Sequence, residues 1–339
     1  FNIEKFNSSQ NKYLKIYSVL LIIFSLSIFS RLRDHGLEIS PQLILLIVSY
    51  LIIEIYMGNS IDVEKSLKKI LILCMTAIIL RISSVSILPV VFIVCLKHYK
   101  ETLNIIGNKK LIFYCVFISL IFFSKNFITS GCLIYPISQT CFKNEQIPWT
   151  IGKKISQINK EVLHSFSRGW MIYAKEKTKT KDKFIFNPTN NISTNKEYLE
   201  KNTKEWIKYW IKDPDTIRIL NLIIISFFII IIFFIFNFNR ITFLKLKNES
   251  KLFCLLILIF LPQLLFWFFI STPSLRIGGY ASILPIFIIL ILLVLNIFLK
   301  GSFLINKSFV FLIIISIAYF SYKNISRLYK DYYFTNYSL

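Results

Sequence analysis

Nine strongly apolar stretches divide this chain of 339 residues, and most of them reach the about 17–25 residues that a helix needs to cross a membrane. Backbone amides in lipid must bond within their own segment, so we expect helices. The two stretches between Leu67 and Leu96 are shorter and predict an incomplete or tilted hairpin. The stretches run over Lys12–Ser30, Pro41–Tyr56, Leu67–Leu80, Ser84–Leu96, Lys109–Ser124, Ile217–Phe238, Leu252–Ile270, Ala281–Leu299 and Leu304–Tyr322. The predicted fold class is therefore all-α, a polytopic integral membrane protein with about nine transmembrane helices.

The Lys and Arg residues in the flanks and short loops of these stretches fall in alternating heavy and light clusters. Cytoplasmic loops retain basic residues, so the heavy clusters are predicted to lie inside. The N-terminus of the chain is then cytoplasmic, and Arg31, Arg33, Arg81 and Arg276 lie at the outer face. The long segment 125–216 is basic but is also predicted outside, because long loops translocate regardless of charge.

Composition supports a membrane protein and divides the chain into regions. A chain that is 55% hydrophobic, with mean hydropathy +0.61, is not an ordinary soluble domain. Its net charge of +22 is spread over the loops rather than gathered on one stripe, which favours anionic lipid head groups over nucleic acid as partners. We expect an N-terminal bundle (1–124), an extracytoplasmic loop region (125–216), a C-terminal bundle (217–322) and a tail (323–339). Because the chain opens on Phe1 without a signal-peptide pattern, we expect it to be a fragment that lacks its N-terminal part.

Two segments of the loop region have the apolar spacing of helices. They are Lys154–Lys175 and Asn195–Lys212, and Asp213-Pro214 is expected to end the second one. Trp206, Tyr209 and Trp210 share one side of that second helix. Paired tryptophans before an apolar stretch suit the membrane–water interface, so one interpretation is a helix lying on the outer leaflet. A gate for a lipid substrate is the other.

The first polar motif is Arg31-Leu-Arg-Asp-His-Gly36 with Glu38, which is predicted to lie in the first outer loop. Carboxylates and imidazoles accept protons from nucleophilic hydroxyls, so Asp34, His35 and Glu38 are the candidate catalytic residues. A guanidinium matches phosphate oxygens in a bidentate fork, which makes Arg33 a candidate phosphate ligand. The alternative is a solvated turn held by local salt bridges.

The second motif is Ser271-Thr-Pro-Ser-Leu-Arg276-Ile-Gly-Gly-Tyr280 in another short outer loop. Two glycines beside an arginine let the backbone approach a bulky anionic group, so Arg276, Gly278 and Gly279 form a candidate site for a lipid phosphate. An interfacial anchor that snorkels is the alternative for Arg276. Arg81 is either a further cation in the same site or an anchor at the tip of a hairpin.

Six cysteines occur, and only Cys132 and Cys141 lie in a polar outer segment. An oxidising compartment permits a disulfide between them. The other four lie in apolar stretches, where cysteine behaves as a small apolar residue. No histidine or further cysteine clusters near the pair, so we predict no metal site there. No cofactor is evident, since phosphate-binding loops and nucleotide-binding glycine motifs are absent from the sequence.

Three segments of this chain resemble polytopic proteins encoded in bacterial surface-polysaccharide gene clusters: RLRDHGLEISPQ (31–42), KNFITSGCLIYPISQTCF (125–142) and STPSLRIGGY (271–280). Those proteins in turn are similar to the C-type membrane glycosyltransferases, which use polyprenyl-phosphate-linked sugars. The resemblance implies a bacterial cytoplasmic membrane protein with an outer-face active site, an acidic base and arginines on the lipid phosphate. In the C-type enzymes the acidic motif usually lies in the first outer loop of the full protein.

Two functions from different classes follow. One is a membrane glycosyltransferase or polymerase that acts on lipid-linked sugars during synthesis of a cell-surface glycan. The other is a non-enzymatic transporter or assembly component for the same glycan. A transporter is expected to carry broken helices or ionisable pairs at mid-membrane, and this sequence has few. Its polar motifs gather at one predicted interface, which favours the enzyme.

Overall fold

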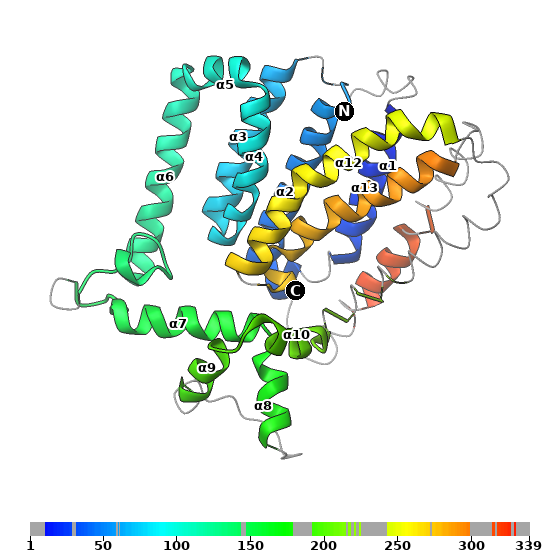
Figure 1. The fold of residues 1–339 in the computed structure, drawn as a ribbon. Coiled ribbons are helices and arrows are strands. Elements are labelled where there is room, and N and C mark those ends of the chain that lie inside the picture. The colour runs from blue at the N-terminus through cyan, green and yellow to red at the C-terminus, as the bar shows by residue number, and fades with distance from the viewer. Residues whose placement is uncertain are drawn as a thin grey trace. The chain divides into compact units, whose positions relative to one another are not determined.

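The structure is a computed structural model, and the elements that it describes are helical (Figure 1). Within the described residues there is no strand, only an isolated antiparallel bridge between Cys132 and Cys141. The predicted all-α class is therefore confirmed. The described residues are 11–28, 32–58, 60, 62–143, 147–178, 192–214, 216–217, 220–221, 224, 243–271, 273–298, 314–315, 317–326 and 329.

The chain forms two compact units. Unit 1 comprises residues Phe1–Ile105, Phe228–Leu265 and Gly278–Leu339, and unit 2 comprises Ile106–Phe227 and Phe266–Ile277. Unit 2 thus joins the whole predicted loop region (125–216) to a short segment, Phe266–Ile277, that begins about fifty residues after that region ends. The segment overlaps the second polar motif, so the loop region and part of the motif belong to one packed body.

Unit 1 is a helix bundle. Helix α2 packs against α1, α3 and α13, and α12 packs against α13 and α4 (Figure 1). Its buried centre is formed by branched aliphatic and aromatic side chains such as Ile52, Ile70 and Phe260. The helices are α1 (Asn11–Ile28), α2 (Leu32–Tyr56), α3 (Val63–Leu80), α4 (Leu88–Lys97), α5 (Tyr99–Ile106), α12 (Phe243–Leu265) and α13 (Tyr280–Phe298), with a 3₁₀ turn η3 (Ile82–Ile87) before α4.

A buried amide ties α2 to α13 inside unit 1. Gln42 is 2% exposed, and its Oε1 accepts bonds from the backbone N–H groups of Tyr280 (2.9 Å) and Ala281 (3.4 Å). The first N–H groups of a helix lack partners within the helix, so a side chain from a neighbouring helix satisfies them here. This contact is one that periodicity in the sequence does not predict.

Unit 2 contains α6 (Lys109–Ser130) and a group of shorter helices. Asn108 caps α6 by accepting bonds from the N–H groups of Lys110 and Leu111, and Gly131 follows its last turn. Helix α7 packs against α9, α8 and η4, and α10 packs against α8. The shorter elements are η4 (Ser138–Thr140), α7 (Gly152–Ser167), α8 (Trp170–Thr178), α9 (Ile192–Leu199), α10 (Thr203–Ile211), η6 (Phe266–Ile270) and η7 (Leu275–Gly279), which ends in unit 1.

The predicted count of nine spans is only partly supported. Among the described residues, three helical segments are long and apolar enough to cross a membrane: Ile39–Tyr56, Lys109–Ser130 and Lys251–Ile270. A fourth is possible if Ile82–Lys97 and Tyr99–Ile106, which meet at a bend of 106°, form one broken span. The predicted stretches over Ile217–Phe238 and Leu304–Tyr322 lie largely outside the described residues.

The remaining predicted spans fall short for physical reasons. Helix α3 has the length, but Glu64, Lys65, Lys68 and Lys69 charge its first two turns. Asp62 caps this helix by accepting a bond from the N–H of Lys65 (2.9 Å). The first and eighth predicted spans contain shorter apolar helices, Tyr13–Ser25 and Ile277–Leu293.

Candidate functional site

A cavity of about 240 Å³ lies within unit 2. Three parts of the chain form its wall: the corner between α7 and α8, the end of α10, and the segment that follows η6. Its lining is mostly apolar and aromatic, with hydroxyl groups and one carboxylate, which is the usual composition of a small-molecule site. The lining residues are Leu163, Phe166, Ser167, Gly169, Met171, Ile172, Trp210, Asp213, Thr216, Pro273, Ser274, Leu275 and Ile277.

The corner between α7 and α8 exists because Gly169 interrupts the helix predicted over Lys154–Lys175. Gly169 has φ +86°, a left-handed conformation that side chains with a Cβ rarely adopt. The backbone of α10 also lies against it: a Cβ at this position would sit 2.7 Å from the carbonyl carbon of Tyr209 and 2.8 Å from the nitrogen of Trp210. The single predicted helix is therefore wrong, since Gly169 turns the chain and lets α10 approach.

The end of α10 brings a carboxylate to the cavity. The predicted helix Asn195–Lys212 is interrupted as well, because Asn202 caps α10 by accepting a bond from the N–H of Glu205 (3.1 Å). Asp213 follows α10, and its Oδ2 accepts a bond from the N–H of Thr216 (3.3 Å). Asp-Pro at the start of the next helical turn is a common N-terminal arrangement. Asp213-Pro214 thus ends α10 as predicted, and it also positions the carboxylate in the cavity wall.

The third wall is the segment Pro273–Ile277, which two tryptophans hold in place. The indole Nε1 of Trp210 donates to the carbonyl of Pro273. Trp267 Nε1 donates to the carbonyls of Ser274 (3.3 Å) and Ile277 (3.1 Å). The flanking elements η6 and η7 are π-helical, with the N–H of Ser271 bonded to the carbonyl of Phe266. Single π-helical turns occur frequently at functional sites.

An aromatic cluster supports the cavity from behind. Trp170, Ala174, Tyr198 and Trp206 are buried together, and Phe268 packs on Trp206 with a ring separation of 5.4 Å. Trp206 is only 3% exposed. The interpretation that this side of the second loop helix lies on the lipid is therefore wrong for Trp206, because α8, α9 and η6 cover it.

The first polar motif lies in unit 1 and is helical. Helix α2 begins at Leu32, so the loop predicted around Arg33, Asp34, His35 and Glu38 is wrong from that residue onward. The helix places Asp34 and Glu38 one turn apart on one face. The side chains of all four lie outside the described part of the chain, and their catalytic or phosphate-binding roles stay predictions.

The other predicted phosphate ligands are divided between the units. Arg276 lies between the cavity-lining residues Leu275 and Ile277 in unit 2, and its side chain is outside the described set. Gly278 and Gly279 are buried at the start of unit 1, where Gly278 has φ +91° and its carbonyl accepts a bond from Ser282 Oγ (3.0 Å). Arg81, also in unit 1, ends α3, and its N–H bonds the carbonyl of Ala77 (3.0 Å).

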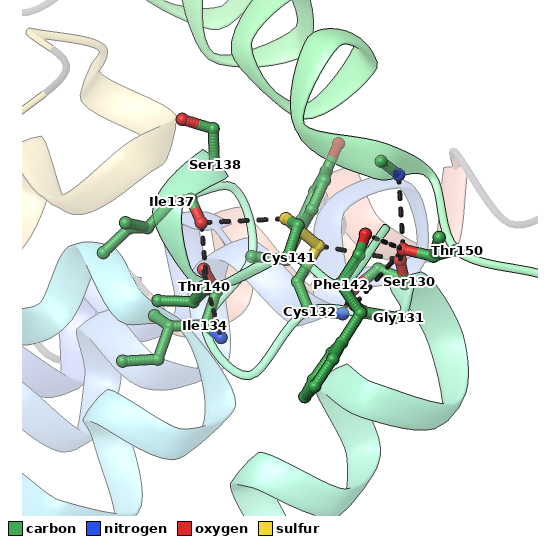
Figure 2. Close-up of a disulfide and its surroundings, with 12 residues drawn as sticks. Ser130, Gly131, Cys132, Ile134, Ile137, Ser138, Thr140, Cys141, Phe142 and Thr150 are labelled. Atoms are coloured by element: carbon green, nitrogen blue, oxygen red, sulfur yellow. Dashed lines mark hydrogen bonds between the residues drawn. A yellow bond between two sulfur atoms is a disulfide. The ribbon is translucent and has the colours of Figure 1, made fainter. Parts of the chain in front are cut away.

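Cys132 and Cys141 are bonded in the structure, with an S–S distance of 2.09 Å (Figure 2). Thr150 holds the start of this loop from the other side. Its hydroxyl lies 3.2–3.3 Å from the carbonyl oxygens of Ser130, Gly131 and Phe142, as Figure 2 shows. The disulfide and Thr150 thus fix the chain where it leaves α6 and runs to α7.

We predict that the disulfide forms in the mature protein and that removing it loosens this loop. In a chain-entropy estimate, closing so short a loop stabilises the fold by about 2–3 kcal/mol. After denaturation without reductant, alkylation should label Cys74, Cys95, Cys115 and Cys254 but leave the pair unlabelled until a reductant is added. Alkylation of Cys132 and Cys141 under the first condition would contradict the prediction.

The residues that sequence reasoning missed are Asp213 as a cavity carboxylate, and the hydroxyls of Ser167, Thr216 and Ser274. The sequence did carry a signal for Asp213, because this carboxylate comes three residues after Trp210, at the end of a segment that also contains Trp206 and Tyr209. Within the described residues there is no cluster of three or more His, Cys, Asp or Glu side chains suited to a metal ion.

The described residues define a helical protein with three helices of membrane-crossing length and a small cavity within unit 2. A family model described as a domain of unknown function (DUF8201) matches residues 1–191, more than half of the chain, and the chain belongs to that family. The match covers α1 through α8 and ends before Asp213. No curated protein and no solved structure matches the chain.

Proposed function

We propose that this protein is a multi-pass membrane glycosyltransferase that acts on lipid-linked sugars at the outer face of a bacterial cytoplasmic membrane. The observation that carries the proposal is the cavity in unit 2, where Trp210 and Asp213 face a common space with three hydroxyl-bearing residues. A sugar ring offers an apolar face of C–H groups and a rim of hydroxyls. An aromatic wall with a few polar groups suits both.

The size of the cavity favours a small ligand. Typical sites for drug-sized molecules measure about 300–1,000 Å³, and this one, at about 240 Å³, is smaller. A single sugar ring therefore suits it better than a longer chain. The wall formed by Pro273–Ile277 belongs to the motif that resembles the polysaccharide-cluster proteins, which links the cavity to the resemblance.

Asp213 is the candidate base in this scheme. Its carboxylate would accept the proton of an acceptor hydroxyl while that oxygen attacks the anomeric carbon of the donor. The bond from the anomeric carbon to the phosphate oxygen would break, and the polyprenyl phosphate would leave as an anion. A cation near the departing phosphate would stabilise the charge that develops there. Arg276, next to two cavity-lining residues, is the predicted source of that cation.

The direction of α6 supports an outer-face site. The helix begins at Lys109 and Lys110 and runs to Ser130, two residues before the disulfide. Basic residues mark the cytoplasmic end of a span, and disulfides persist in oxidising compartments outside the cytoplasm. Both signals favour a topology in which the α6 N-terminus is inside and the disulfide loop and α7 are outside.

Replacing Asp213 by asparagine tests the proposal. Asparagine caps helices as well as aspartate does, so the turn at Thr216 should persist while the charge is lost. Loss of a general base typically costs about a hundredfold or more in rate. We expect surface-glycan production to fall by that order in a strain that depends on the Asp213→Asn protein.

Asp62→Asn is the matched control, because Asp62 also caps a helix through its carboxylate but does not line the cavity. The Asp62→Asn strain should make normal amounts of glycan at equal protein level. Normal glycan production by the Asp213→Asn strain would show that Asp213 is not a general base. A transporter or assembly component would then be the better interpretation.

A further inference from the structure

Three basic residues follow one another at four-residue intervals from the middle of α7 to the residue that caps its C-terminus. They are Lys160, His164 and Arg168, and this spacing places them on one face of the helix. Cations near a helix C-terminus interact favourably with its dipole, by about 0.3–1 kcal/mol. That effect explains why basic residues occur here, but it does not explain why the last of them is half-buried.

Arg168 is a half-buried cation. Its guanidinium carbon lies 5.3 Å from the centre of the Trp206 ring, and its Nε is buried without a hydrogen-bond acceptor among the described residues. Within the described residues, no carboxylate forms an ion pair with it. Burial lowers the pKa of the Arg168 side chain, and the pKa of His164 is lowered by burial and then by Arg168 and Lys160. The positive charge of Arg168 is therefore partly desolvated at this corner, and His164 is neutral near pH 7.

The position of Arg168 is fixed by its backbone and its stacking partner. The hydroxyl of Tyr198 donates to the carbonyl of Arg168 (2.8 Å), and the guanidinium carbon lies over the Trp206 ring. An arginine stacked on an aromatic ring is preorganised for bidentate recognition of an oxyanion. A buried N–H that lacks an acceptor costs free energy, and an anion bound at the guanidinium would remove that cost.

We propose that Arg168 binds a phosphate group, with Lys160 adding positive charge along the same face of α7. Arg168 lies in the sequence between Ser167 and Gly169, which both line the cavity, but Arg168 itself is not a lining residue. The proposal rests on the proposed function in one respect, namely that the phosphate belongs to a polyprenyl lipid. Free inorganic phosphate presents the same oxyanion and is the alternative ligand.

Binding to the purified full-length chain in detergent separates these sources. The probes are inorganic phosphate, farnesyl phosphate as a short polyprenyl phosphate, and farnesol as its neutral counterpart. Binding is followed by equilibrium dialysis and by indole fluorescence, since Trp206 adjoins the guanidinium. We expect farnesyl phosphate to bind and farnesol not to. If inorganic phosphate binds equally well, the site takes free phosphate; if it binds far more weakly, the site takes a lipid phosphate.

Arg168→Lys keeps the charge but loses the planar guanidinium and its bidentate fork, and it should weaken binding by about tenfold or more. Lys153→Gln, at the exposed start of α7, removes one charge elsewhere and should bind as the wild type does. Binding of no probe, or wild-type binding by Arg168→Lys or by Arg168→Gln, would overturn the proposal. These measurements need no sugar transfer, so their failure is distinct from a failure of the Asp213 test.

Discussion

Gly169→Ala should separate α10 from the corner between α7 and α8. An alanine at φ +86° pays about 1–2 kcal/mol for the left-handed backbone. Its Cβ would also lie 2.7–2.8 Å from backbone atoms of Tyr209 and Trp210, which have no flexible end that can move aside. Overpacking of this kind costs about 1–3 kcal/mol, so we expect a total loss of about 2–5 kcal/mol. Hydrogen exchange measured by mass spectrometry should show faster exchange throughout α8 and α10.

Gly58→Ala is the matched control for the steric part of this effect. Gly58 has φ +69°, but a Cβ there would meet no atom within 4 Å. Replacing Gly58 should therefore cost only the free energy of the left-handed backbone, and it should leave hydrogen exchange in α8 and α10 unchanged. Gly58→Ala and Gly169→Ala could each lower the hydrogen-exchange protection of their own segment by the same amount. In that case the close approach of α10 contributes nothing to the stability lost in Gly169→Ala. Local exchange is the appropriate measure, because one melting temperature is not well defined for a chain with two units.

The sequence predicts the helices of this protein better than it predicts their ends. Apolar runs such as Pro41–Tyr56 identify α2 because the pattern is local. The breaks at Gly169 and Asn202 were missed, although both residues are frequent at helix ends. Helical spacing of apolar residues continues across each break, so periodicity alone does not detect it. At Gly169 the decisive fact is the backbone of α10 lying against it, which depends on residues forty positions further along.

The candidate site was predicted only in part for a similar reason. The motif Ser271–Tyr280 was identified from its arginine and glycines, and its residues Pro273–Ile277 do form one wall of the cavity. The opposite wall comes from Ser167, Gly169 and Asp213, which lie sixty or more residues earlier. Which segments meet is decided by packing of apolar side chains, and an amphipathic pattern shows which side of a helix is apolar but not what covers it.

The second large effect is expected at Trp170. Its side chain is fully buried among Ala174, Tyr198 and Trp206, and its ring packs on Phe166 with a centroid separation of 5.3 Å. Replacing a buried tryptophan by alanine typically costs about 3–5 kcal/mol, because apolar contact is lost and a cavity remains. We expect Trp170→Ala to raise hydrogen exchange in α8, α9 and α10 together, since all three helices contribute to the cluster around it.

Trp149→Ala is the matched control, because Trp149 also belongs to unit 2 but is 59% exposed. It packs edge-on against Phe127 and should lose little stability when truncated. If Trp149 lies at the lipid interface, as a tryptophan near the outer end of a span often does, its truncation should weaken association with vesicles instead. A large loss of protection in α10 for Trp149→Ala, with little for Trp170→Ala, would show that the aromatic cluster does not support the cavity. In that case the position of Asp213 would depend on contacts at the membrane surface rather than on the core of unit 2.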